Sequence, residues 1–190
     1  MLYVVRHGQT AANAAGQLLG RADVPLTELG QRQAKALAVA LDGHVERVVS
    51  SPLRRARDTA AAFGLPVEVD ERWTELDYGV YDRLPLAEVP QDMWEQWRGD
   101  AEYTPPEGES LASVGRRVRA ACDDLAGAAA QSDVVVVSHV SPIKAAVGWT
   151  LDVGDHVTWR MFVAVASITR IAISDRGPIL RSFNEVAHLG

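Results

Sequence analysis

The sequence predicts an α/β fold, a three-layer α/β/α sandwich with a mostly parallel central sheet. Three short runs rich in β-branched residues, Leu2–Val5, Val45–Val49 and Val134–Val137, lack strict alternation, as expected of strands covered on both faces. Segments with helical periodicity lie between them. Because crossovers between parallel strands are right-handed, this alternation places helices on both faces of the sheet.

Capping residues mark the ends of the first two helices. Thr27 can cap a helix that runs to about Leu41, with Gly43 as its stop. Ser51–Pro52 predicts the start of the second helix, because serine is a good cap and proline suits the first helical position. Gly64 predicts its end.

A third helix is predicted to begin at Ser110, and its apolar residues recur at spacings of three and four. They form one buried stripe: Leu111, Val114, Val118, Cys122 and Leu125. Ser141–Pro142 repeats the serine-proline start directly after the valine run. Further strands are expected at Val67–Val69, Ser167–Ile173 and Ile179–Phe183.

At 190 residues the chain is expected to form one domain, 1–190, without internal repeats or linkers. The stretch 84–110 is rich in proline and contains Trp94 and Trp97. It is predicted to leave the core as a lid or side wall.

Composition narrows the class of protein. The chain is 47% hydrophobic and 23% charged, as in ordinary globular proteins, and its net charge of -6 argues against nucleic-acid or anionic-membrane partners. The single cysteine, Cys122, cannot form an internal disulfide and favours a reducing compartment. No run approaches the ~20 apolar residues of a membrane span, and the apolar start is too short for a signal peptide. A soluble, cytoplasmic protein is expected.

Cationic and imidazole groups follow three predicted strand ends. Arg6 and His7 follow the first strand, Arg54 follows the second, and His139 follows the valine run. Singly, each has an ordinary structural interpretation, as a satisfied polar residue or a solvated charge. Ligands bind at the carboxyl ends of parallel strands, however, so the shared placement favours a positive pocket that matches a phosphoryl group.

Four stretches, in order, carry a family resemblance. They are Val4–Thr10, Leu26–Ala34, Ser50–Ala56 and Val137–His139, with Asn13 after the first. Together they resemble the histidine phosphatase superfamily, also called the phosphoglycerate mutase-like family, over essentially the whole chain. The implied fold is phosphoglycerate mutase-like.

The resemblance implies a chemical role for each of the clustered residues. His7 would attack the phosphorus and become a phosphohistidine, while Arg6, Arg54 and His139 would hold the three equatorial oxygens. A loose phosphoryl-transfer transition state needs mainly positioning and charge neutralisation. Attack requires a neutral imidazole whose other ring nitrogen donates a hydrogen bond. No metal and no other cofactor is then needed.

A general acid must protonate the leaving oxygen. The segment 73–79 resembles the family's acid-bearing stretch, and Glu75 stands where its glutamate is expected. Asp77, two residues on, is the competing carboxylate. A surface loop carboxylate is the ordinary alternative for Glu75.

Further substrate contacts are expected from Asn13, Gln17, Arg21 and Val140. Asn13 and Gln17 would donate to the phosphate or the substrate, or else cap the loop. Arg21 is either a substrate-side cation or solvated. Where the family commonly has glycines after the second histidine, this chain has Val140; its N–H is expected to face the phosphate, and Ser141 to cap the helix.

Other positions are given structural interpretations. His44, His156 and His188 have no partner at metal-ligand spacing. Lys144, one turn into the helix after His139, is expected to be solvated, with a position that leans toward the pocket as the alternative. Asp82–Arg83 replaces a glutamate-glycine pair that many relatives carry, a departure expected to bear on substrate choice.

The leading functional hypothesis is a phosphomonoesterase that acts on a small phosphorylated metabolite. A phosphoglycerate mutase-type phosphotransferase is the alternative, although the family's mutases carry a lysine and paired arginines in the excursion, where this chain has only Arg98. A weakly active phospholigand-binding protein and a metallohydrolase are further alternatives. The physiological substrate and the oligomeric state are not predicted, and a homodimer stays open.

Overall fold

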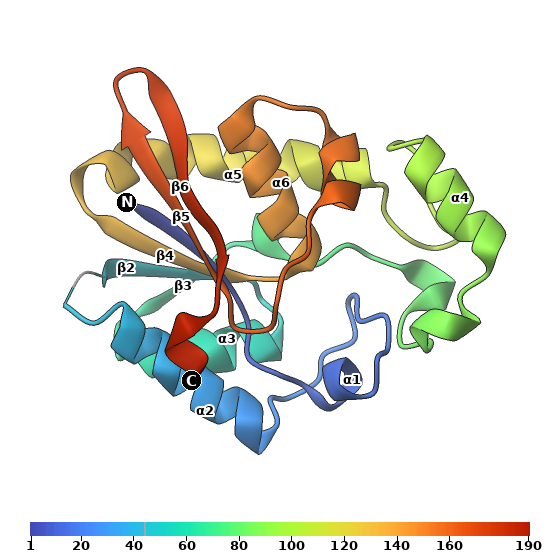
Figure 1. The fold of residues 1–190 in the computed structure, drawn as a ribbon, viewed down its shortest axis with the longest axis horizontal. Helices are drawn as coiled ribbons and strands as arrows, with labels where there is room; N and C mark the ends of the chain where they lie inside the picture. Colours follow the sequence, from blue (N-terminus) through green and yellow to red (C-terminus); the bar gives the residue numbers. More distant parts are fainter. Residues whose placement is uncertain (44) are drawn as a thin grey trace.

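The computed structural model describes residues 1–43 and 45–190, so His44 lies outside the described residues (Figure 1). Its centre is a six-stranded sheet in the order β3-β2-β4-β1-β5-β6. The strands are β1 (Leu2–Arg6), β2 (Val45–Ser50), β3 (Val67–Val69), β4 (Asp133–Ser138), β5 (Ile168–Ser174) and β6 (Gly177–Glu185). The first four pair in parallel, and β5 and β6 continue the sheet antiparallel. This confirms a mostly parallel central sheet.

Helices cover both faces of the sheet. The helices of the described chain are α1 (Ala11–Ala14), α2 (Glu28–Ala40), α3 (Arg54–Ala60), α4 (Gln91–Gly99), α5 (Leu111–Gln131) and α6 (Val140–Leu151). Short 3₁₀ turns are η1 (Ala61–Phe63), η2 (Glu71–Trp73), η3 (Gly79–Tyr81), η4 (Leu86–Glu88), η5 (Asp155–Arg160) and η6 (Ala187–Leu189). In Figure 1, α5 and α6 lie above the sheet, and α2 and α3 lie below it. The three-layer sandwich is therefore confirmed.

Side chains of the central strands belong to two separate hydrophobic cores, one on each face of the sheet. In β1, Leu2 and Val4 join the core beneath α5 and α6, whereas Tyr3 and Val5 join the core beneath α2 and α3. The run Val134–Val137 in β4 alternates in the same way. Because both faces of these strands are buried, an uninterrupted apolar run is the pattern that suits them.

The predicted helix starts at Thr27 and Ser110 are confirmed. Their hydroxyls accept hydrogen bonds from the backbone N–H three residues on, at 3.0 and 3.1 Å. Gly64 follows η1 with a φ of 69°, a left-handed conformation that glycine adopts without steric cost.

The two serine-proline starts were wrong in detail. Helix α3 begins at Arg54 rather than at Pro52, and the Ser51 hydroxyl bonds the His139 ring. Helix α6 begins at Val140, one residue before the expected cap Ser141, with His139 at the N-cap position. In both places the serine or the helix start contributes to the site described below.

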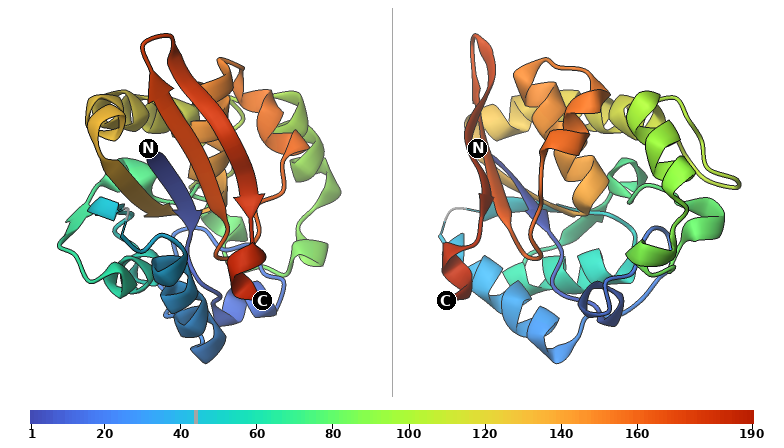
Figure 2. Two further views of the ribbon diagram at one scale, coloured as in Figure 1. Left: turned by 60° about the vertical axis from the view of Figure 1, so that its left-hand side comes forward. Right: turned by 45° about the vertical axis from the view of Figure 1, so that its right-hand side comes forward.

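The stretch 84–110 contains α4, which lies at the flank of the sandwich (Figures 1 and 2). Met93 and Trp97 on α4 are buried against the core that lies under α5 and α6. Trp73, in η2, is fully buried in the same core. The excursion therefore packs one helix against the main body, and its service as a lid stays a prediction.

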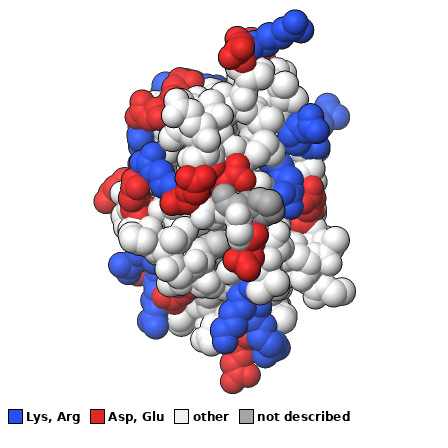
Figure 3. Space-filling view, turned by 90° about the vertical axis from the view of Figure 1, so that its left-hand side faces the viewer, with Lys and Arg blue, Asp and Glu red and all other residues white. Residues whose placement is uncertain are grey.

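The surface carries both signs of charge. On the face drawn in Figure 3, acidic and basic side chains are interspersed. No helix within 1–43 or 45–190 has the length and apolar character needed to cross a bilayer.

Candidate active site

The loop after β1 presents His7 at the carboxyl end of the sheet. Its backbone N–H donates to the Ser138 carbonyl at 3.0 Å, which extends the pairing of β1 with β4. The Nδ1 of His7 lies 2.7 Å from the Gly8 carbonyl oxygen, which can only accept, so Nδ1 carries the proton. Nε2 is left with a lone pair. Burial, followed by the charges of Arg55 and Arg6, holds the pKa of His7 well below 6.5, so the ring is neutral.

The structure places Arg55, not Arg54, beside His7. The Nε of Arg55 donates to His7 Nε2 at 3.2 Å, and Nη1 and Nη2 donate to the carbonyls of Ala22 and Gly20 at 2.8 and 2.7 Å. Arg55 is fully buried. Burial lowers its pKa to about 10, with the Glu75, Asp82 and Asp23 charges acting in the opposite direction.

The prediction for Arg54 was therefore wrong. Its side chain is 57% exposed and lies 3.4 Å from Asp58, one helical turn on. Successive helical residues point about 100° apart, so only one of two neighbouring arginines can face inward. Thr59, one turn after Arg55, marks the inward face: its hydroxyl accepts from the Gly8 N–H at 3.0 Å and ties α3 to the loop that carries His7.

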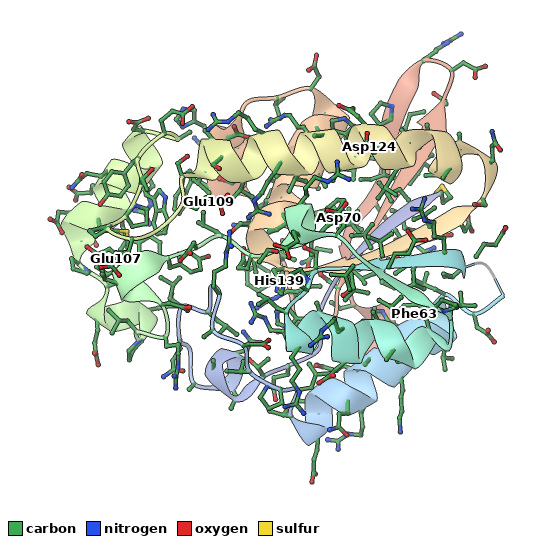
Figure 4. The ribbon with its side chains drawn as sticks, turned by 180° about the vertical axis from the view of Figure 1, so that it is seen from behind. Phe63, Asp70, Glu107, Glu109, Asp124 and His139 are labelled. Carbon is green, nitrogen blue, oxygen red and sulfur yellow. The ribbon has the colours of Figure 1, made fainter. Side chains whose placement is uncertain are left out.

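His139 lies directly against His7, with ring centroids 5.0 Å apart. Its Nδ1 accepts from the Nε of Arg55 at 3.2 Å, so Nε2 carries the proton and donates to the Ser51 hydroxyl at 2.7 Å. Burial, then the charges around it, holds the pKa of His139 well below 6.5. Figure 4 shows His139 near the middle of the molecule. In this arrangement both ring nitrogens are occupied, so its predicted contact with phosphate stays a prediction.

Glu75 lies at the N-terminus of α6. Its carboxylate accepts from the N–H groups of Val140 and Ser141 at 3.0 and 3.1 Å, and from its neighbour Leu76 at 2.7 Å. The free N–H groups of a helix start are a favourable place for a carboxylate. Glu75 therefore caps α6 in place of Ser141. In this arrangement Glu75 occupies the Val140 N–H, so the predicted contact of that N–H with phosphate stays a prediction.

An ion network holds the Glu75 backbone in place. Arg21 Nε and Arg117 Nη2 both donate to the Glu75 carbonyl, at 3.2 and 3.4 Å, and Glu109 pairs with both arginines. Burial opposes the charge on Glu109, but the hydrogen bonds and charge of Arg117 outweigh it and lower the pKa of Glu109. Arg21, 44% exposed, thus braces the acid segment. It does not line the cavity described below.

The remaining predicted side chains divide between loop and cavity. Asp77, the competing carboxylate, accepts from the Gly79 N–H at 2.9 Å and closes a turn, away from His7. Asn13 has the expected capping role, since its Oδ1 accepts from the Thr10 N–H at 3.1 Å. Asn13 and Gln17 also line the cavity, and their contact with substrate stays a prediction.

A cavity of about 290 Å³ opens over His7. Its polar lining comprises Arg6, His7, Asn13, Gln17, Glu75, Ser141, Lys144 and Thr158. Its apolar lining comprises Leu18, Leu19, Leu76, Tyr78, Leu86, Trp94, Trp97, Leu111, Val140 and Trp159. Arg6 donates from Nη1 to the Val163 carbonyl at 2.8 Å, and within the described part of the chain its buried Nε has no partner. The guanidinium therefore keeps donors for a ligand.

Lys144 was expected to be solvated, yet it lines this cavity one turn into α6. Burial lowers its pKa, with Glu75 acting in the opposite direction. The signal that could have placed it is its spacing of four from Val140, which puts both side chains on one face of the helix. Arg55 was missed for a similar reason. Ala56 and Thr59 lie on the buried face of α3, and their spacing from Arg55 is the signal that could have placed Arg55 on that face.

The departure at Asp82–Arg83 shapes a loop. The Asp82 carboxylate accepts from the N–H groups of Gly20 and Ala22 at 2.7 and 2.8 Å, the same segment whose carbonyls bind Arg55. Arg83 has a φ of 70°, a left-handed conformation that is costly for residues other than glycine. These residues act on the site by holding the 20–22 loop.

Within residues 1–43 and 45–190 there is no group of three or more His, Cys, Asp or Glu side chains arranged to hold a metal ion. His188 bonds the Ala166 carbonyl at 2.9 Å, and His156 lies at a separate surface groove. Cys122 is buried, as its helical stripe predicts.

Known proteins resemble this chain over its full length. A sequence profile described as histidine phosphatase superfamily (branch 1) matches residues 2–186. A bifunctional protein of Mycobacterium tuberculosis is 37% identical over 198 residues, which cover 99% of this chain and 54% of the relative; the chain thus spans about half the length of that relative. A probable phosphoglycerate mutase of Yersinia enterocolitica is 33% identical, covering 99% of this chain and 94% of the relative.

Solved structures share the fold closely. A phosphoserine phosphatase variant from Entamoeba histolytica, in complex with phosphoserine, superposes with a TM-score of 0.89 at 28% identity, covering 99% of this chain and 98% of that one. A mycobacterial glucosyl-3-phosphoglycerate phosphatase in complex with VO3 superposes with a TM-score of 0.88 at 31% identity, covering 97% and 98%.

Proposed function

Because the chain belongs to the histidine phosphatase superfamily, and is an enzyme of the phosphatase or mutase-like kind, we propose that it is a phosphomonoesterase that hydrolyses a small phosphorylated metabolite through a phosphohistidine on His7. The observation that carries the proposal is the state of His7: a buried, neutral ring whose Nδ1–H is held by the Gly8 carbonyl and whose Nε2 lone pair is free of a proton.

Arg55 and Arg6 supply the positive charge for the transferring phosphoryl group. Arg55 donates to His7 Nε2 with no substrate bound, and an arriving phosphate oxygen would take over that donor. Arg6 lines the cavity with donors to spare. His139 contributes once Nδ1 gains a proton. A phosphate dianion next to the ring supports that protonation, because it offsets the charges that now lower the pKa of His139.

Glu75 is proposed as the acid and then the base. It lies at the edge of the cavity, fixed by three N–H donors, so its carboxyl group can reach a leaving oxygen without rearrangement. In the first half-reaction the P–O bond breaks, His7 Nε2 gains the phosphoryl group, and Glu75 gives its proton to the leaving oxygen. In the second, Glu75 takes a proton from water, which attacks phosphorus and releases His7 and phosphate.

Hydrolysis is favoured over mutase transfer by the excursion 84–110. Its one arginine or lysine, Arg98, is exposed and stacks over the Trp159 ring at 5.7 Å, outside the cavity. Within the described chain, the excursion therefore lends no cation to a second acidic end of the substrate. The mutase alternative would require transfer of phosphate from a bisphosphate donor to a second hydroxyl.

The donor set also supports a metal-independent reaction, because arginine, histidine and glutamate groups suffice for phosphoryl transfer by this route. The net charge of -6 and the single buried cysteine agree with a cytoplasmic enzyme that acts on metabolites rather than on nucleic acid.

The purified protein is expected to hydrolyse p-nitrophenyl phosphate in the presence of a chelator, with inhibition by vanadate. His7→Ala is expected to abolish turnover. Rapid acid-free quenching with a ³²P-labelled substrate should trap label on wild type but not on His7→Ala, and peptide mapping should locate it at His7.

Full activity of His7→Ala, or activity that vanishes with chelator and returns with a metal, would overturn the mechanism. Release of free phosphate at the rate of substrate loss distinguishes hydrolysis from transfer. Stoichiometric appearance of a second phosphorylated product would instead support the mutase alternative.

A further inference from the structure

The cavity extends beyond the reacting groups to a wall of three tryptophans. Trp94 and Trp97 from α4 and Trp159 from η5 have ring centroids 5.7 to 6.4 Å apart and line the cavity together. In the proposed mechanism the phosphate lies over His7, and this wall is then available to contact the leaving group. We call this part of the cavity the leaving-group side.

One cation lines the cavity besides the arginine already assigned to phosphate. The Lys144 side chain is substantially buried, and across the described chain it makes no ion pair and no hydrogen bond. The charge of Glu75 acts on Lys144, but the Glu75 carboxylate forms its hydrogen bonds with the N–H groups of Leu76, Val140 and Ser141. Lys144 therefore brings an unpaired positive charge to a partly enclosed cavity, where it is available to pair with an anion that enters.

The wall beside Lys144 is also not uniformly apolar. Trp97 Nε1, Trp159 Nε1 and Thr158 Oγ1 are buried and have no hydrogen-bond partner within the described residues. All three residues line the cavity. Buried donors in native proteins are usually satisfied, so unpaired ones at a ligand cavity favour an occupant that brings acceptors.

We propose that Lys144 is a specificity residue that binds a carboxylate on the leaving group, so that the enzyme prefers phosphomonoesters of hydroxy acids over those of neutral alcohols. The inference rests on the proposed phosphatase function and adds the class of leaving group. The position of Lys144 explains the geometry: it stands one helical turn above Val140, whose N–H holds Glu75. A leaving oxygen beside Glu75 therefore lies on the same side of the cavity as the ammonium group.

A carboxylate fits this place better than a second phosphate. The described cavity adds one ammonium group on the leaving-group side, and no second arginine fork is present there to bind phosphate in a bidentate manner. A single ammonium beside aromatic rings and a hydroxyl suits a singly charged group on a compact leaving group.

The test compares two substrates that share a carbon skeleton, 3-phosphoglycerate and glycerol 3-phosphate. They differ mainly in a carboxylate against a hydroxymethyl group. Wild type is expected to favour the carboxylate substrate in kcat/KM by about tenfold or more, the range of one charged hydrogen bond. Lys144→Met is expected to remove most of that preference, mainly through KM for 3-phosphoglycerate, and Lys144→Arg to keep it.

The second lysine of the chain provides a matched control. Lys35 is exposed on α2, so Lys35→Met makes the same change of charge outside the cavity and should keep the wild-type preference. An unchanged preference in Lys144→Met, or equal losses on both substrates, would overturn the role of Lys144. A wild type that hydrolyses neither these esters nor p-nitrophenyl phosphate would instead overturn the phosphatase function itself.

Discussion

At the scale of single residues, neighbouring Arg54 and Arg55 offer a direct test of the site. Arg55→Lys is expected to lower kcat/KM by at least about a hundredfold, because a lysine cannot bond His7, Gly20 and Ala22 at once. Arg54→Lys should stay within about twofold of wild type, since Arg54 only pairs with Asp58 at the surface. Steady-state kinetics on p-nitrophenyl phosphate checks both variants. The reverse order of effects would return Arg54 to the site.

Glu75→Gln separates the acid role from a structural role. For an alkyl phosphate, whose leaving oxygen needs a proton, kcat is expected to fall by about 10² to 10⁴. For p-nitrophenyl phosphate, whose leaving group departs without one, the loss should be much smaller. An equal loss on both substrates would contradict the assignment of Glu75 as the acid.

The same variant should also lose stability. The carboxylate accepts at both oxygens, from Val140 on one and from Ser141 and Leu76 on the other, whereas an amide has one acceptor. An unsatisfied N–H at the start of α6 costs about 1 to 3 kcal/mol. Urea unfolding measures this loss, and Asp77→Asn, at the turn carboxylate, serves as a comparison.

The residue scale also shows what the sequence could predict. The structure brings together four residues that the sequence singled out, Arg6, His7, Glu75 and His139. They follow strand ends or lie in motifs, where position in the chain alone is informative. The choice between Arg54 and Arg55 depends on the rotation of a helix that begins two residues later than its serine-proline start suggests. Lys144 was missed because burial of a charged side chain depends on what α4 and η5 place over it.

At the scale of elements, the N-terminus of α2 crosses the loop that carries His7 at two glycines, Gly8 and Gly30. A Cβ at Gly30 would collide with the Gln9 carbonyl oxygen, and one at Gly8 with the Gly30 carbonyl oxygen. This close approach lets the Thr27 hydroxyl and the Gln9 carbonyl meet at 3.3 Å. It fixes the backbone on which His7 stands.

Gly30, at this crossing, can be compared with Gly127, a helical glycine in α5 with open space around it. Gly30→Ala is expected to destabilise the protein by about 1 to 3 kcal/mol and to lower activity, because the backbone at Gln9 must shift. Gly127→Ala, in α5, meets no neighbouring atom and should stabilise the protein by up to about 1 kcal/mol through helix propensity. Thermal unfolding and kcat of both variants test this contrast. A neutral Gly30→Ala would show that the crossing is loosely packed.

Elements with strong local signals were predicted well. The valine-rich strands and the helices capped by Thr27 and Ser110 are dictated by burial and by a hydroxyl at the helix start. Helix α4 was not predicted, because it begins after Pro90 without a side-chain cap and has few buried positions. Its place in the fold comes from tertiary contacts of Met93 and Trp97.

At the scale of the whole molecule, the two site histidines couple stability to pH. His7 and His139 are neutral in the fold, with pKa values well below 6.5, whereas the unfolded chain protonates them near 6.5. The contribution is complete above pH 6.5 and is lost as pH falls toward the folded pKa values, because the unfolded state then binds more protons. Carboxylates with lowered pKa values, such as Glu109, change the free energy of unfolding only at lower pH, near and below the ordinary glutamate pKa of 4.5.

The free energy of unfolding is thus expected to fall below pH 6.5 by about 1.4 kcal/mol per pH unit for each of the two histidines. Urea unfolding between pH 7.5 and 5.0 measures the slope. His7→Gln should remove about one histidine's share of this slope. A slope in His7→Gln equal to that of wild type would mean that His7 is charged in the fold. A charged ring could not attack phosphorus, so this measurement tests the nucleophile without any substrate.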